Sequence, residues 1–325
     1  MSLNPGSATL TVDDDPRRYE HLSRIRLEDP EAVARAAKAR RRHPGPKAGK
    51  QNFIVAADHP ARGALAVGSD PVAMADRRQL LDRLRIALAN PDVDGVLASP
   101  DIMDDLLLLG ALEGKLVFGS MNRGGLTGLV NEFDDRFTGH TAAALEALGA
   151  DGGKMLTRIC LEDPDTVVTL EATAKAIDSL AERKLIAMVE PFLSVRVNGK
   201  VRNDLSTDAV IKSIAIAEGL GSTSAYTWMK LPVVAQMERV MRRPPCPPSS
   251  WAGTPRGHRT RSSRPGKRPS PSPACRASPS DGPCCTRRTA TLPAQSPPRL
   301  RSSTTPQKYR SNLPWRREQQ QEPAG

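Results

Sequence analysis

Between residues 52 and 240 the sequence alternates short apolar runs with longer amphipathic stretches, and this alternation limits the folds open to the chain. The apolar runs are rich in Val, Ile and Leu and cover residues 52–57, 95–98, 115–120, 154–159, 184–189 and 225–231. Helical spacing of apolar residues covers residues 76–89, 138–148, 164–183 and 207–220, after a first helix over residues 30–42. Strands that alternate with helices of this length predict right-handed βαβ units and a parallel sheet.

Six such units predict an α/β protein: a (β/α)8 TIM barrel that is incomplete at its C-terminal end by two units. A doubly wound nucleotide-binding sheet usually has a glycine-rich turn after its first strand. Here the first strand runs on into Ala57-Asp58-His59-Pro60. We therefore expect an N-terminal extension with a helix (residues 1–50), a partial barrel domain (residues 51–241) and a tail (residues 242–325).

Four positions are expected to begin helices. Asp29, Asp70 and Asp163 each precede a proline, and Ser206 precedes the last amphipathic stretch. Asp or Ser at the N-cap can accept hydrogen bonds from the free N–H groups of the first turn, and proline at the next position has no N–H to satisfy.

Residues 242–325 differ sharply in composition from the rest of the chain. They contain 17 basic side chains against three acidic ones, a net charge of +14, with 17 of the 29 prolines and four of the five cysteines. Because aliphatic residues are few and follow no period, this composition indicates a disordered basic tail. We further hypothesise that a GC-rich gene is read there in the wrong frame.

The genetic code alone offers a test of this hypothesis. If the last base of each codon is joined to the first two bases of the next, every Pro becomes Ser, Pro, Thr or Ala, and every Cys or Trp becomes Leu, Met or Val. Residues 244–254 then permit an apolar strand that ends in Gly-Gly-Asp, and residues 281–287 permit Gly-Arg-Ala-Leu-Leu-Tyr-Pro. The first segment lies where the seventh strand of a barrel is due.

Residues 1–241 carry 30 basic and 33 acidic side chains and a single cysteine, Cys160. One cysteine argues against a disulfide framework and fits a reducing compartment. No apolar run approaches the roughly 20 residues of a membrane span. The N-terminus also lacks the basic-then-apolar layout of a signal peptide. We therefore expect a cytoplasmic protein without a membrane partner.

Two lysines lie inside strands that are otherwise apolar. Lys154 is in the fourth predicted strand and Lys230 in the sixth, and Glu190 ends the fifth. Barrel active sites form at the C-terminal ends of the strands, so these three side chains are expected to lie together. A lysine among other cations in a dry pocket loses its proton more readily and can attack a carbonyl carbon to form a Schiff base. A neighbouring carboxylate can transfer protons.

Each of the three residues also has a structural explanation. A single lysine in a strand usually lies near the strand end, and its ammonium group extends into solvent. Glu190 stands before Pro191 and is compatible with a solvated loop. The occurrence of all three residues on successive strands favours a site.

Four motifs resemble those of the class I aldolases of the DhnA and tagatose-bisphosphate type, and most closely an actinobacterial branch of deoxyribose-phosphate aldolase-like proteins. The resemblance covers roughly residues 53–241. It is carried by Ala56-Ala-Asp-His-Pro-Ala61, Gly149-Ala-Asp-Gly-Gly-Lys-Met155, Val189-Glu-Pro-Phe192 and Trp228-Met-Lys-Leu-Pro232.

This resemblance implies a carbon–carbon lyase that acts on a sugar-phosphate-like substrate without a cofactor. It implies that Lys230 is the Schiff-base lysine, Lys154 the neighbouring cation and Glu190 the acid/base, with Asp58 a further polar group at the end of the first strand. In the family the loops after the seventh and eighth strands bind the substrate phosphate. In this chain the tail stands where these two strands and their loops are due. Asn122 and Arg123 follow the third strand and are candidates for an anion contact, although an ordinary turn explains them equally well.

Other readings of the chain remain open. His59 has no second His at metal-ligand spacing and Cys284-Cys285 lacks a paired motif, so we predict no metal site. One alternative is a truncated, catalytically inactive barrel, because a barrel without two strands exposes edges that should pair. Another is a basic protein that binds nucleic acid through its tail. We do not favour it, because the tail has no module fold or stacking platform. Homo-oligomerisation is left open by the sequence.

Overall fold

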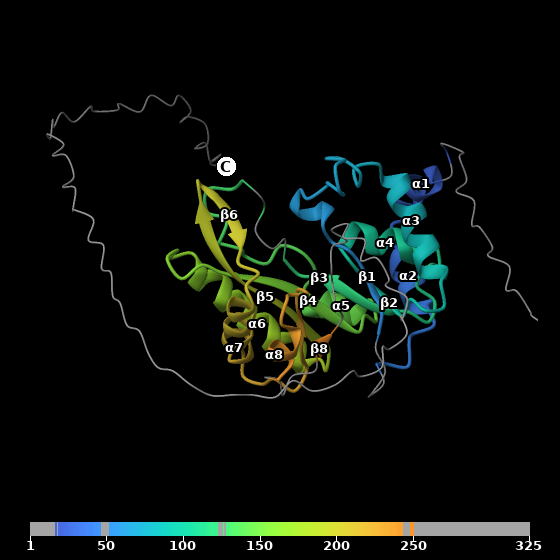
Figure 1. Cartoon of the computed structure of the whole chain (residues 1–325). Coiled ribbons are helices and arrows are strands. Elements are labelled where there is room, and N and C mark those ends of the chain that lie inside the picture. The colour runs from blue at the N-terminus through green and yellow to red at the C-terminus, as the bar shows by residue number, and fades with distance from the viewer. Residues whose placement is uncertain are drawn as a thin grey trace, which may run out of the picture. The chain divides into compact units, whose positions relative to one another are not determined.

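The computed structural model describes residues 17, 19–46, 52–122, 126 and 128–242, together with the backbone of 248–249. Its fold is mixed α/β (Figure 1). Seven strands lie side by side in a parallel sheet in chain order, and β6 pairs in antiparallel fashion with the end of β5. The strands are β1 (Ile54–Ala57), β2 (Gly95–Ala98), β3 (Leu116–Ser120), β4 (Gly152–Ile159), β5 (Ile186–Val197), β6 (Lys200–Asn203), β7 (Thr227–Lys230) and β8 (Pro248–Ser249).

The six predicted strands and their parallel arrangement are confirmed. The two-residue β8 pairs with Met229 and Lys230 of β7, next to the sixth predicted strand. The prediction was wrong about the length of β5, which continues past Glu190-Pro191 to Val197 and turns back as a hairpin with β6. Proline usually ends a strand because it lacks an N–H donor. Here Pro191 lies within the strand and is paired with Thr157 of β4.

The predicted helices appear with bounds a few residues shorter, and the structure has three further α-helices. The 3₁₀ turn η1 follows β1. The elements are α1 (Glu20–Glu28), α2 (Ala32–Ala39), η1 (Pro60–Arg62), α3 (Arg77–Ala89), α4 (Pro100–Leu108), α5 (Ala142–Ala147), α6 (Thr166–Glu182), α7 (Thr207–Glu218) and α8 (Met237–Met241). Three of these helices, α1, α4 and α8, were not predicted from the sequence. No helix of the described part combines the length and apolar character needed to cross a membrane.

Of the four predicted helix caps, only Ser206 is confirmed, since its hydroxyl accepts a hydrogen bond from the N–H of Ala209. The helices α2 and α6 begin two residues after the expected Asp, at N-caps Glu31 and Asp165. Asp70 lies in a turn instead, where its carboxylate accepts from the N–H of Val72 at 2.9 Å. An Asp side chain can bond the backbone two residues on in a turn as readily as at a helix start, so the Asp-Pro pair does not distinguish the two.

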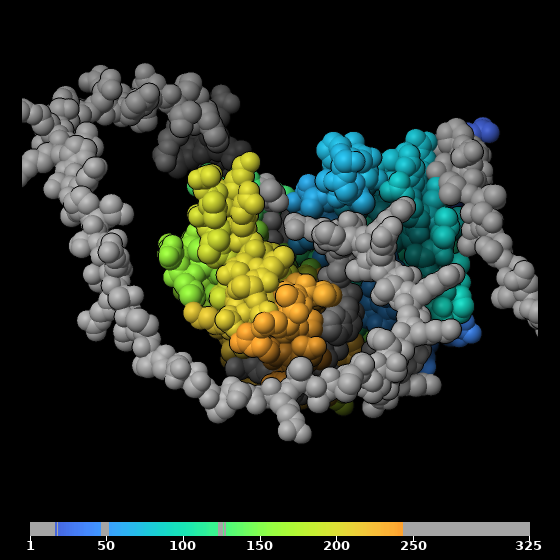
Figure 2. All heavy atoms as spheres, viewed as in Figure 1, coloured from blue at the N-terminus to red at the C-terminus, as the bar shows by residue number. Residues whose placement is uncertain are grey.

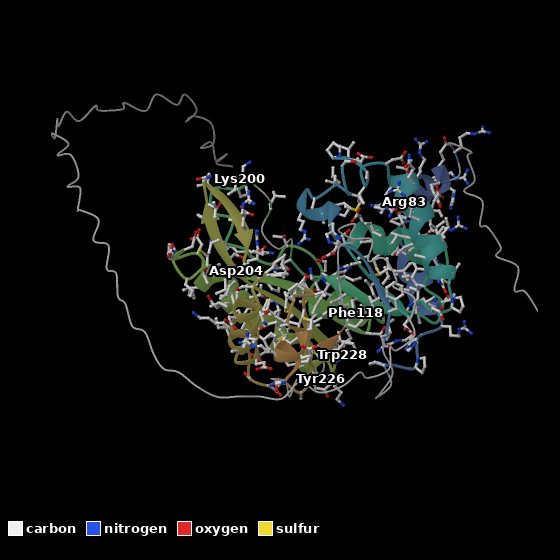
Figure 3. The ribbon with its side chains drawn as sticks, viewed as in Figure 1. Arg83, Phe118, Lys200, Asp204, Tyr226 and Trp228 are labelled. Carbon is white, nitrogen blue, oxygen red and sulfur yellow. The ribbon has the colours of Figure 1, made fainter. Side chains whose placement is uncertain are left out.

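The sheet is strongly curled. The rings of Phe118 in β3 and Trp228 in β7 have centroids 6.0 Å apart (Figure 3), although β4 and β5 lie between their strands. Neighbouring strands are about 4.8 Å apart, so a flat sheet would hold these two strands roughly 14 Å apart. The inner faces of the strands therefore converge, as in the wall of a barrel.

Two apolar clusters hold the fold together. On the inner side of the sheet lie Leu97, Leu116, Phe118 and Met188, with Trp228 and other partly buried side chains packed against them. The larger cluster lies between the sheet and the helices and includes Tyr19, Leu22 and Ala37 of the N-terminal segment. Because both faces of a parallel sheet are covered, its strands are apolar almost throughout, which explains the continuous apolar runs in the sequence.

Candidate active site

The four predicted catalytic residues lie on the inner side of the curled sheet, above the apolar cluster. Lys154 is in β4 beside Ser120, the last residue of β3, and Glu190 is in β5 beside Leu156. Lys230 is the last residue of β7, and Asp58 directly follows β1. Since inward-facing side chains alternate along each strand, β4 and β5 direct Lys154 and Glu190 to the place where β1 and β7 end.

The four side chains form a continuous chain of alternating charge. The ammonium group of Lys154 lies 2.9 Å from Oδ2 of Asp58 and 2.8 Å from Oε2 of Glu190. The other oxygen of Glu190, Oε1, accepts a hydrogen bond from the ammonium group of Lys230. All four residues are at most 9% exposed. Glu190 therefore bridges the two lysines, and Asp58 is bound to only one of them.

The pairing separates the two lysines chemically. Burial alone lowers the pKa of Lys154, but the charges of Asp58 and Glu190 outweigh it, and the pKa is raised. Burial also lowers the pKa of Lys230, the nearby charge of Lys154 adds to this, and the single carboxylate of Glu190 does not compensate. The pKa of Lys230 is therefore lowered. Of the two, Lys230 is the better source of a neutral amine.

Both carboxylates are held in the ionised form. Burial raises the pKa of Glu190, but the charges of Lys154 and Lys230 outweigh it and lower the pKa to about 2. Asp58 behaves in the same way, with Lys154 as the main opposing charge, and its pKa is well below the usual range. The site can thus supply an ionised carboxylate next to a lysine.

His59 lies at the edge of this group, with its Nδ1 3.7 Å from Oδ1 of Asp58. Burial lowers its pKa, and the charge of Asp58 only partly offsets this. Within the described residues no three His, Cys, Asp or Glu side chains come together in a way that could hold a metal ion.

Asn122 is buried and its side chain is engaged by protein groups. Its Nδ2 donates to Oδ2 of Asp135 at 2.9 Å and to the carbonyl of Leu156 at 2.8 Å, while its Oδ1 accepts from the N–H of Leu156 at 2.9 Å. Asn122 therefore fixes the backbone of β4 beside Glu190. A contact between Asn122 and the substrate stays a prediction, and Arg123 lies outside the described residues.

We expect Asn122→Ala to lower the free energy of unfolding by about 1–3 kcal/mol, because buried polar groups of Leu156 lose their partners. Urea denaturation of the variant and the wild type at pH 7 measures this loss. Asn122→Asp keeps an acceptor for the N–H of Leu156 but sets a buried carboxylate against Oδ2 of Asp135 and the carbonyl of Leu156, so it should cost at least as much as the alanine variant. Unchanged stability of Asn122→Ala would contradict a role for this residue in fixing the backbone of β4.

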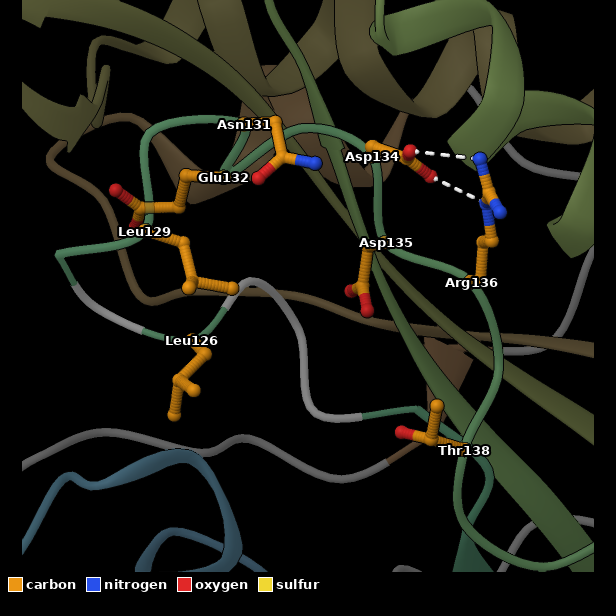
Figure 4. Close-up of a pocket in the computed structure, with 8 residues that line it drawn as sticks. All are labelled: Leu126, Leu129, Asn131, Glu132, Asp134, Asp135, Arg136 and Thr138. Atoms are coloured by element: carbon orange, nitrogen blue, oxygen red, sulfur yellow. Dashed lines mark hydrogen bonds and ion pairs between the residues drawn. The ribbon is translucent and has the colours of Figure 1, made fainter. Parts of the chain in front are cut away.

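Eight residues of the loop between β3 and α5 line a pocket of about 380 Å³ (Figure 4). Asp134 pairs with Arg136 on one side of the pocket, at 3.0 Å, and Leu126 and Leu129 lie on the other. Asp135, which also lines the pocket, is the residue that Asn122 binds. This hydrogen bond ties the pocket wall to the strand that carries Lys154.

The loop around the pocket is held by two arginines that the sequence analysis did not single out. Arg158 extends from β4 on the face that carries Lys154 and binds Glu132 at 2.8 Å. Arg196 of the β5–β6 hairpin binds Asp163 and donates to the carbonyl of Val130 at 3.2 Å. Both guanidinium groups lie against the ring of Phe133. The hairpin stands out from the surface, in yellow in Figure 2. Only the tertiary structure reveals these contacts.

Comparison with known proteins finds similar solved structures. The crystal structure of Cgl0159 from Corynebacterium glutamicum is 55% identical in sequence, over 72% of this chain and 79% of that one, with a TM-score of 0.70. A Schiff-base-forming fructose-1,6-bisphosphate aldolase is 18% identical over 62% of this chain and 74% of its own, with a TM-score of 0.43, too low to support an inference. No curated protein matches the sequence.

The sequence model of one family matches residues 50–263. The match includes every strand of the sheet and all four residues of the ionic chain. It covers more than half of the 325 residues, and the chain belongs to the Cgl0159-like family.

Proposed function

We propose that the protein is a class I aldolase-type carbon–carbon lyase that acts on a sugar-phosphate-like substrate through a Schiff base on Lys230. The observation that carries the proposal is the ionic chain, in which a buried lysine of lowered pKa contacts a carboxylate that a second lysine keeps ionised. Such a pairing of a nucleophilic amine with an adjacent acid/base is what Schiff-base chemistry requires. The motif resemblance to DhnA-type aldolases supports the same assignment.

The reaction begins with the neutral amine of Lys230. Its nitrogen attacks the ketone carbon of the substrate, the resulting carbinolamine loses water, and an iminium ion forms. Glu190 accepts the proton from the hydroxyl group on the carbon beyond the scissile bond. That C–C bond breaks, an aldehyde leaves, and the electron pair moves toward the iminium nitrogen to give an enamine. Protonation of the enamine carbon and addition of water then release the ketone product and restore Lys230.

Lys154 is the competing nucleophile, and its contacts argue against that role. Its ammonium group bonds to two carboxylates, it is only 2% exposed, and its pKa is raised. A lysine in this state serves better as a fixed cation that keeps Asp58 and Glu190 ionised. We therefore assign the covalent step to Lys230 and the electrostatic role to Lys154.

Borohydride trapping tests the proposed function directly. The full chain is incubated with dihydroxyacetone phosphate or short aldehydes, reduced, and mapped by peptide mass spectrometry. An adduct at Lys230 supports the proposal. A folded protein that gives no adduct, both in this chain and in a version with its reading frame restored after Met241, counts against the Schiff base.

The pH dependence of the trapping rate is a separate prediction. Because the pKa of Lys230 is lowered, the rate should rise with pH and level off below the ordinary lysine value of 10.5. Lys154→Met removes a charge that helps to lower this pKa, so the midpoint should move to higher pH. Initial rates with cyanoborohydride across pH 6–10 measure both midpoints. A shift to lower pH in the variant would contradict this account of the two lysines.

We also propose that the tail is read out of frame. The support is the abrupt change in composition after Met241 and the apolar segment that the shifted frame permits over residues 244–254. Sequencing the gene, together with close relatives, tests this proposal. Relatives that carry the same Arg-, Pro- and Ser-rich tail in frame would overturn it.

A further inference from the structure

The tip of the β5–β6 hairpin, residues 197–202, presents positive charge without an acid of its own. Lys200 lies at the far end of the hairpin, as Figure 3 shows, and Arg202 follows it in β6. Both side chains are exposed, and within the described part of the chain neither forms an ion pair. Val197 pairs with Lys200 across the hairpin and is 43% exposed. An aliphatic side chain and a cation therefore stand together on one face of the tip.

The turn fixes the shape of the tip. Asn198 and Gly199 have φ of 51° and 74°, the left-handed values that a two-residue type I′ turn requires. At the base of the hairpin Oγ of Ser194 donates to Oδ1 of Asn203 at 2.9 Å. A preformed tip of this kind loses little conformational entropy when another molecule binds it.

The pocket of the β3–α5 loop has the complementary character. Its lining carries three carboxylates against one cation: Glu132, Asp134, Asp135 and Arg136. Arg158 of β4 offsets the charge of Glu132, and a negative balance remains. Leu129 adds an apolar side chain to the wall and is 47% exposed. The pocket therefore suits a cation that is attached to an aliphatic segment.

The hairpin and the pocket adjoin each other in the same chain. Arg196, next to the tip, donates to the carbonyl of Val130 at 3.2 Å, and its guanidinium lies 5.1 Å from the centroid of the Phe133 ring. Val130 follows Leu129 of the pocket lining and is 93% exposed. A two-fold interface uses the same patch on both copies, so that patch must contain both complementary parts. The adjoining hairpin and pocket meet this requirement.

We propose that two copies of the chain associate around a two-fold axis, with the basic hairpin tip of each copy against the acidic pocket of the other. Lys200 and Arg202 then gain the counter-charges that they lack within one chain. The contact also covers the exposed side chains of Val197, Leu129 and Val130. Exposed apolar groups beside complementary charges are typical of protein interfaces. The pocket, of about 380 Å³, is a small cleft that a single long side chain can enter.

A charge exchange between two variants of the full chain tests the proposal. The hairpin variant is Lys200→Glu with Arg202→Glu, and the pocket variant is Asn131→Lys with Asp134→Asn. Arg24→Glu with Lys38→Glu is the matched control, because it changes the net charge as much as the hairpin variant does, at exposed positions of α1 and α2. Sedimentation velocity measures the mass of each protein, and of a mixture of the first two, over a wide range of concentration.

We expect the wild type and the control to form a dimer as the concentration rises, and high salt to weaken it. The hairpin and pocket variants should each associate at least about tenfold more weakly, because like charges then face each other. An equimolar mixture of the two variants should restore the dimer, since each acidic hairpin then meets a basic pocket and each basic hairpin an acidic one.

Several results would overturn the proposal. One is a wild type that stays monomeric at every concentration, and another is a dimer or larger assembly that persists in the hairpin or the pocket variant. A control that is weakened as much as the hairpin variant, or a mixture that does not restore the dimer, would also reject it. Thermal unfolding shows whether each variant is folded. If the pocket variant is not, Asn131→Lys alone, which keeps the Asp134–Arg136 pair, decides.

Discussion

Lys230→Met should slow adduct formation with the trapped carbonyl donor by about a thousandfold or more, because methionine has no amine to attack the carbonyl carbon. The change keeps a long side chain in place of one that is only 5% exposed, so the site remains filled. The rate is measured by intact mass spectrometry of the full chain with dihydroxyacetone phosphate and cyanoborohydride. The modified lysine is located by peptide mapping.

A matched control is available on the surface. Lys175 on α6 pairs with Glu171, and its side chain is 74% exposed, so Lys175→Met should trap donor at the wild-type rate. An adduct that persists in Lys230→Met and maps to Lys154 would reverse the roles of the two lysines. Nonspecific modification of exposed lysines would persist equally in both variants.

Lys154→Met should be the most destabilising single substitution in the site. It leaves Asp58 and Glu190 buried without the cation that lies 2.9 and 2.8 Å from them. Removing one partner of a buried ion pair costs about 3–5 kcal/mol, mainly because the remaining charge is poorly solvated. Urea denaturation at pH 7 measures the change. The double variant with Asp58→Asn should lose less stability than the two single losses add up to.

The cost of Lys154→Met should also depend on pH. Because Lys154 lowers the pKa of Asp58 and Glu190 in the folded state, the stability that it provides is present above the carboxyl values of the unfolded chain, near 4. That stability is lost as the pH falls through the folded values, about 2 for Glu190. The raised pKa of Lys154 keeps its contribution intact up to at least 10.5. A loss at pH 3 as large as that at pH 7 would show that packing, not charge, sets the effect.

The sequence by itself determined the type of fold and the chemical groups of the candidate site. Continuous apolar runs and helical spacings are local properties, so the order of strands and helices can be read without knowing any contact. A lysine inside an apolar strand is also visible locally, because burial of an unpaired lysine is rare. These two signals were enough to single out Lys154, Glu190 and Lys230.

Local patterns were insufficient where a side chain has two good uses. Asp70 suits a helix cap or a turn, and Asn122 suits an anion contact or a backbone clamp. Which use prevails depends on what the neighbouring segments present. For Asn122, the neighbouring segment is β4, where Leu156 presents a backbone N–H and a backbone carbonyl. The side-chain amide of Asn122 forms a hydrogen bond with each of them.

Only the tertiary structure decided how the four charged groups divide their partners. Lys154 and Lys230 stand in similar apolar strands, and nothing in their flanking residues distinguishes one pKa from the other. The curl of the sheet brings Asp58 of the first strand to Lys154 of the fourth, so that one lysine gains two carboxylates and the other shares one. The reactivity of a buried amine depends on the charges within a few ångströms of it, and residues far apart in the sequence supply those charges.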